Sequence, residues 1–110
     1  MEITEQQRNK ILKWICKKSG IEKLFLENGC LCCQKSFTTY DDRAYITQYH
    51  IFAFTEEDTI LIRCNSNNDI LEKIIDLSGK GYTISNSSYI KILSPFTSLE
   101  QLAVEADLNV

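Results

Sequence analysis

The most apolar part of the chain, residues 45–77, reads as strand, turn, strand and helix. Its two strand segments, YITQYHIFAF and TILIRC, are separated by Thr55 to Asp58, a loop length typical of a β-hairpin. Because strand side chains alternate, this loop fixes both the register of the hairpin and the two faces that it presents. The predicted cross-strand pairs are Phe54 with Thr59, Phe52 with Leu61, Ile51 with Ile62, His50 with Arg63 and Tyr49 with Cys64.

The two faces of this hairpin differ in the residues that they carry. The first face is wholly apolar and is expected to lie under a helix; it carries Tyr49, Ile51, Ala53, Ile60, Ile62 and Cys64. The second face carries Phe52, Phe54 and Leu61, with His50 and Arg63 at its far end. Since an open apolar patch on a monomer invites association, we expect another element to cover this second face as well.

Three segments have the period of amphipathic helices. The N-terminal helix begins at a Thr4–Gln7 capping box and has the strongest apolar stripe, so it is expected in the core, beside the central helix or across the second hairpin face. The central helix is predicted over about 69–78, with an Asp69–Glu72 capping box and Gly79 in the left-handed C-terminal position. A short helix after Pro95 is rich in alanine and acidic residues, and we expect it to dock loosely or to be displaced by a partner.

The remaining segments are read as strands and loops. Asn28–Gly29 between two apolar runs predicts a tight hairpin, with a short helix over 21–26 as the alternative. Residues 35–43 are interpreted as a connection with exposed aromatics, and residues 82–93 as a second hairpin or a bulged strand. The sequence therefore predicts a small single α+β domain spanning residues 1–110. Its antiparallel sheet of about four to six strands packs with the N-terminal helix, the central helix and the short C-terminal helix.

Composition narrows the possible functions of the chain. Its 110 residues are 44% hydrophobic with a net charge of −3, which predicts one domain and disfavours direct nucleic-acid binding. No apolar run approaches the length of a membrane span, and no signal peptide is recognised, so a cytoplasmic protein with no membrane association is expected. Five cysteines in such a compartment are expected to be reduced thiols, mostly buried, and no cofactor is predicted.

The cysteines and the single histidine are the candidates for chemistry. Cys30, Cys32 and Cys33 contain a C-x-x-C spacing, and the alternative to a metal-free protein is a zinc site made from Cys30, Cys33, Cys64 and His50. A structural zinc site usually has a second closely spaced pair of ligands. Here Cys64 and His50 are isolated in the sequence and are predicted on opposite faces of the hairpin. We therefore expect buried thiols and a structural or surface histidine.

Cys64 ends a strand and precedes a loop that leads to the start of a helix, where a thiolate would gain from the helix dipole. The succession TILIRC, NSNN, DILEKIIDL and GKGYTI is similar to the active-site segment of rhodanese-like sulfurtransferases. That resemblance implies a nucleophilic Cys64. The loop of that family wraps an anion with glycines and an arginine, whereas this loop has neither and places the negative Asp69 there.

No catalytic motif was found, which favours a non-catalytic, protein-binding function. We expect a module of inhibitor, immunity or accessory type, of the kind encoded by phages and mobile elements, whose partner is another protein. The alternative is a thiol-dependent enzyme or zinc-binding regulator that uses Cys64 or the Cys30, Cys32 and Cys33 cluster. Aromatic residues dominate protein interfaces. The expected partner-binding residues are Phe37, Tyr40, Tyr45, Phe52, Phe54 and Tyr89.

Overall fold

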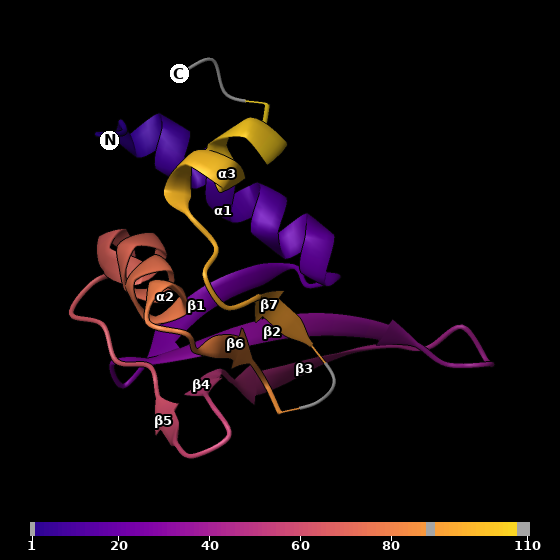
Figure 1. Cartoon of the computed structure of the whole chain (residues 1–110). Coiled ribbons are helices and arrows are strands. Elements are labelled where there is room, and N and C mark those ends of the chain that lie inside the picture. Colours follow the sequence, from indigo (N-terminus) through magenta and orange to yellow (C-terminus); the bar gives the residue numbers. More distant parts are fainter. Residues whose placement is uncertain (1, 88–89, 108–110) are drawn as a thin grey trace.

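Two antiparallel sheets lie on one side of the protein and the helices lie on the other (Figure 1). The computed structural model describes residues 2–87 and 90–107. One sheet has the order β1-β2-β3 and the other β5-β4-β6-β7. The helices are α1 (Glu5–Ser19), α2 (Ile70–Gly79, after a short 3-10 turn, Asn67–Asp69) and α3 (Leu99–Glu105). The strands are β1 (Lys23–Glu27), β2 (Cys30–Thr38), β3 (Ala44–His50), β4 (Phe52–Phe54), β5 (Thr59–Leu61), β6 (Thr83–Ser85) and β7 (Lys91–Leu93).

The expected α+β class is confirmed, with the strands divided between two sheets. A single hydrophobic core joins the helices to the covered face of both sheets. Side chains that are fully buried in it include Ile11 and Ile15 of α1, Leu71 and Ile74 of α2, and Ile84 of β6. Within the described residues, no helix has the length and apolar character needed to cross a membrane.

Local signals in the sequence place several ends of the elements correctly. Thr4 and Gln7 form the reciprocal capping box of α1, and Gly20 ends the helix at φ 72°. Asn28 and Gly29, at φ 53° and 78°, form the predicted turn between β1 and β2 in place of a helix. Ser98 caps α3 by accepting a hydrogen bond from the backbone N–H of Gln101 at 3.1 Å.

The predicted ends of the central helix are wrong. Asp69 precedes α2, but its side chain accepts no capping hydrogen bond, because the 3-10 turn holds the backbone of Asp69 in a helical conformation. Gly79 remains inside the helix, and Gly81 takes the positive φ, 96°. The C-terminal end is instead held by Ser78, whose hydroxyl donates to the carbonyl of Ser94 at 2.6 Å.

The register of the central hairpin is confirmed near its loop and wrong beyond it. Phe52 pairs with Leu61 and Phe54 with Thr59, as predicted. His50, however, pairs with Cys32, and Arg63 bridges Cys30. The reason is that β2 competes for the same backbone groups: the Ile51 N–H donates to the carbonyl of Leu31 at 2.9 Å, and the Leu31 N–H donates to that of Ile62 at 2.8 Å.

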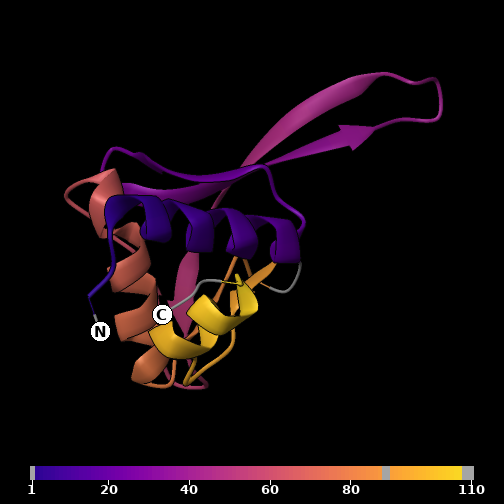
Figure 2. The same ribbon diagram turned by 90° about the horizontal axis from the view of Figure 1, so that it is seen from above.

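Among the described residues, no helix covers the second face of this hairpin, contrary to the expectation that another element would shield it. Leu61 is 38% exposed, and Phe52 and Phe54 are half-buried. The helices gather on the opposite face, as Figure 2 shows from above. Among them is α3, whose Leu102 and Ala103 are fully buried in the core.

Candidate functional site: a β-ribbon arm

The feature that stands out from the body of the protein is a two-stranded ribbon formed by residues 34–48, which we call the arm (Figures 1 and 2). It consists of the outer parts of β2 and β3, paired without a break from Cys32–His50 to Thr38–Ala44. The protein measures 47 × 36 × 23 Å along its principal axes, and its radius of gyration is 14.2 Å. About 13 Å is expected for a compact chain of this length. The arm accounts for this extension.

The arm corrects the interpretation of residues 35–43 as a connection. Only residues 39–43 form the turn, which is closed by a hydrogen bond from the Thr39 N–H to the Arg43 carbonyl at 2.8 Å. The Thr39 hydroxyl hydrogen-bonds to Asp41, whose carboxylate also lies 3.1 Å from Nε of Arg43. Asp42 takes the positive φ, 60°, that reverses the chain. The sequence alone did not reveal this turn, because its polar residues also fit an irregular connection and its closing hydrogen bond joins the ends of two strands.

An aromatic pair occupies one face of the arm. Phe37 and Tyr45 are directly opposite each other on β2 and β3, and their rings stack with centroids 5.3 Å apart. The ammonium of Lys35 lies 5.5 Å from the centre of the Phe37 ring. Aromatic stacking and cation–π contact hold these side chains in place while Tyr45 stays 51% exposed.

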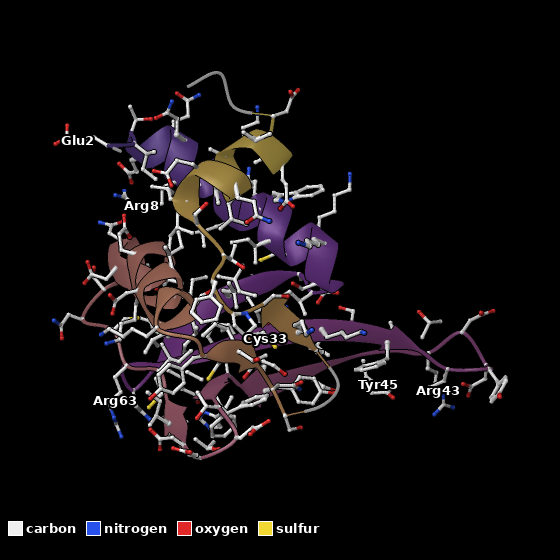
Figure 3. The ribbon with its side chains drawn as sticks, viewed as in Figure 1. Glu2, Arg8, Cys33, Arg43, Tyr45 and Arg63 are labelled. Carbon is white, nitrogen blue, oxygen red and sulfur yellow. The ribbon has the colours of Figure 1, made fainter. Side chains whose placement is uncertain are left out.

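This aromatic face continues the face that is buried in the body. Cys33 and Phe37 are four positions apart on β2, so their side chains point to the same side of the sheet. Cys33 is fully buried, whereas Tyr45 lies out on the arm (Figure 3). On the arm, the face of the sheet that is buried in the body is therefore not covered by the helices.

Apolar exposure extends over the tip and the other face of the arm. Tyr40 in the turn is fully exposed, and Ile46 on β3 is 61% exposed. Ile46 was missed from the sequence because residues 45–54 were read as one strand of the core hairpin. Aromatic and β-branched residues on both sides of the turn, FTT and YIT, were the signal for a ribbon.

The predicted partner-binding residues fall into three places. Phe37, Tyr40 and Tyr45 all lie on the arm, Phe37 and Tyr45 as a stacked pair and Tyr40 in the turn. Phe52 and Phe54 lie half-buried on β4, on the opposite side of the strand from the core. Tyr89 lies outside the described residues. The arm is therefore the largest grouping of these aromatic side chains that the structure describes.

The alternative zinc ligands are not brought together. Cys30 and Cys33 are three positions apart on β2 and so point to opposite faces of the sheet. Cys64 lies beyond β5, and His50 is at the end of β3. Within residues 2–87 and 90–107, no three His, Cys, Asp or Glu side chains are grouped as metal ligands.

The structure does bring together a pair that sequence reasoning missed, Cys32 and His50. These two residues are cross-strand partners, and the Sγ of Cys32 lies 3.5 Å from Nδ1 of His50. A nucleophilic cysteine needs a lowered pKa. Here burial raises the pKa of Cys32, and the nearby Glu27 and Cys30 raise it further. The pair therefore lacks the electrostatic environment of an activated thiol.

Cys64 also lacks an activating environment. Burial raises the pKa of its thiol, and the negative charge of Asp69 raises it further, with a smaller opposing effect from Lys73. Burial likewise raises the pKa of Cys33, to about 11. The start of the helix near Cys64 thus does not supply the thiolate that the sulfurtransferase resemblance implied.

A surface hollow beside α1 offers no catalytic grouping either. It is an open groove of about 520 Å³ between α1 and β1, lined by Leu12, Lys13, Cys16 and Lys17 among others. Burial raises the pKa of Cys16, so the only thiol in the groove is protonated at neutral pH. Comparison of the chain with protein families, characterised proteins and solved structures gave no match.

Proposed function

We propose that the protein is a non-catalytic, protein-binding module of inhibitor, immunity or accessory type, and that its arm binds the partner. The single observation that supports this proposal is the group of aromatic residues on the arm, in which Tyr40 and Tyr45 are exposed and Phe37 is half-buried against Tyr45. Tyrosine and phenylalanine that are already ordered lose little conformational freedom on binding, so their burial contributes strongly to affinity.

The charge of the molecule favours a protein as the partner. The chain carries a net charge of −3, whereas nucleic-acid-binding domains present concentrated positive charge. The tip of the arm adds Asp41 and Asp42, and Asp41 is paired with Arg43. These carboxylates at the tip would repel a phosphate backbone, so the arm is a poor binding site for a nucleic acid.

We also propose a reducing compartment such as the cytoplasm, and an origin in a phage or mobile element. All five cysteines are unpaired in the structure. Unpaired cysteines are usual where cellular reductants keep thiols reduced, and an odd number cannot complete a disulfide framework. The small size and the absence of catalytic motifs in the sequence are the support for the inhibitor type.

The proposal is tested by capturing partners from the native host with the wild-type protein and with matched variants. Phe37→Ala and Tyr45→Ala remove the aromatic pair, and Phe96→Ala removes an aromatic that is 74% exposed on the body. We expect one protein to be retained by wild type and by Phe96→Ala and to be lost with both arm variants. Equal retention by all four proteins, with folding verified by circular dichroism, would exclude the arm as the binding site.

A further inference from the structure

The outer edge of β3 is an open sheet edge that lacks the usual protection against pairing. β3 is the last strand in the order β1-β2-β3, and no other strand of the described residues pairs along its outer side over 44–48. Natural edges are protected by charged residues, proline or bulges. Residues 44–48 read AYITQ and contain no charge and no proline, and their register with β2 is unbroken.

Backbone hydrogen bonds show which residues of β3 have free groups at this edge. The Ile51 N–H donates inward to Leu31 of β2. Antiparallel strands alternate between inward and outward groups, so the odd-numbered residues of β3 bond to β2. The other edge of β2 is consistent with this alternation: the carbonyl of Gln34, an even-numbered residue, points away from β3 and accepts a hydrogen bond from the Glu22 N–H. Ala44, Ile46, Gln48 and His50 therefore direct their N–H and C=O groups outward.

We propose that the partner for this edge is β3 of a second copy, paired antiparallel about a two-fold axis at Thr47. The cross-strand pairs would be Thr47 with Thr47, Tyr45 with Tyr49, Ile46 with Gln48 and Ala44 with His50, each between the two copies. Thr–Thr and aromatic–aromatic pairs are among those that stabilise antiparallel strands. The outward groups of Ile46 and Gln48 then bond to each other across the axis.

This register is set by the sequence of the strand. Moving the axis by one residue, to Ile46 or Gln48, would still pair the outward backbone groups but would no longer place Tyr45 opposite Tyr49. The uncharged edge brings no like charges together, although each copy carries a net charge of −3. A charged peptide would find no complementary group along AYITQ, which favours self-pairing over capture of a charged segment.

The pairing would create one continuous sheet across both copies, in the order β1-β2-β3-β3-β2-β1. A two-fold axis perpendicular to the sheet keeps each face on its own side, so both Phe37–Tyr45 pairs would share one surface. The bodies would lie at opposite ends, because each arm extends away from its own body (Figure 2). This assembly goes beyond the proposed binding function and does not depend on it.

A cysteine at the axis gives the sharpest test. Thr47 would face its own copy in a non-hydrogen-bonded pair, where Cα atoms are about 4.5 Å apart, within the range of a disulfide. We expect Thr47→Cys to form a covalent dimer on mild oxidation with diamide, seen on non-reducing gels. The matched control Ser36→Cys places an exposed thiol on β2, away from the axis. No more dimer from Thr47→Cys than from Ser36→Cys and wild type would overturn the proposal.

Sedimentation velocity supplies a second test that needs no cross-link. Wild type is expected to dimerise with rising concentration, and Thr47→Lys is expected to weaken the dimer by about tenfold or more, since each 1.4 kcal/mol is a factor of ten and like charges would face each other. Ser36→Lys adds the same charge to β2 and should leave the dimer intact. A wild-type monomer across the concentration range, or a dimer equally strong in Thr47→Lys, would contradict pairing through β3.

Discussion

The strand β2 passes through two environments, and comparing them shows what makes the arm different from the body. Leu31 and Cys33, at its start, are fully buried in the core. Phe37 is on the same face of the same strand, yet it is half-buried, stacked on Tyr45 and in cation–π contact with Lys35. The inner part of β2, CLCC, is wholly apolar, whereas the outer part, QKSFT, contains four polar residues and Phe37. Phe37 is therefore an apolar side chain on the core side of the strand that lies outside the buried part of β2.

The largest effect is expected in the body, at α3. Leu102→Ala should lower the free energy of unfolding by about 2 to 5 kcal/mol, because Leu102 is fully buried and its truncation leaves a cavity. Val104→Ala on the same helix is the control, since Val104 is 73% exposed and should change stability by less than about 0.5 kcal/mol. Urea denaturation measures both. Equal small losses would support a loosely docked C-terminal helix.

A smaller effect is expected on the second face of the central hairpin. Phe54 is half-buried there, so Phe54→Ala should cost about 1 to 2 kcal/mol, less than the 3 to 5 kcal/mol typical of a phenylalanine inside a core. Thermal and urea unfolding would measure the loss. A loss of about 3 to 5 kcal/mol would mean that this face is enclosed and would contradict its description as a partly exposed surface.

The arm should contribute still less to stability. Tyr45→Ala removes the stacking with Phe37, and we expect it to lower the free energy of unfolding by about 0.5 to 1.5 kcal/mol. If the arm binds the partner, the same change should lower affinity by more than it lowers stability, as hot-spot aromatics do. A loss above about 3 kcal/mol would show that the arm is part of the cooperative core and contradict its separation from the body.

The smallest effect at neutral pH concerns Cys33, the most strongly perturbed thiol. Its pKa is raised by burial from 9.0 to about 11, so the folded protein holds this proton in a range where the unfolded chain releases it. Stability from this group is therefore complete below about pH 9 and decreases as the pH rises toward 11. Urea midpoints from pH 8 to 11 should fall less steeply in Cys33→Ala than in wild type. Identical slopes would contradict the assignment.

The sequence determined the features that depend on neighbouring residues. Thr4 with Gln7, Asn28 with Gly29 and Ser98 each fix the backbone through hydrogen bonds or φ values within a few residues, so helix starts and a tight turn could be predicted. The apolar face of the central hairpin followed from alternation, and Ile51, Ala53 and Ile62 are fully buried. The α+β class followed from these elements.

Only the tertiary structure decided which strands pair with each other when more than one partner was possible. His50 could pair with Arg63 or with Cys32, and the outcome depended on β2, a strand some 18 residues earlier in the chain. Likewise, residues 35–43 read as a connection, because no local pattern decides whether β2 continues past Cys33 to Phe37 or whether Cys33 alone of the two is fully buried. Short-range patterns set conformation, whereas burial and strand pairing depend on which distant segment occupies the space, and this is why the arm became visible only in the folded protein.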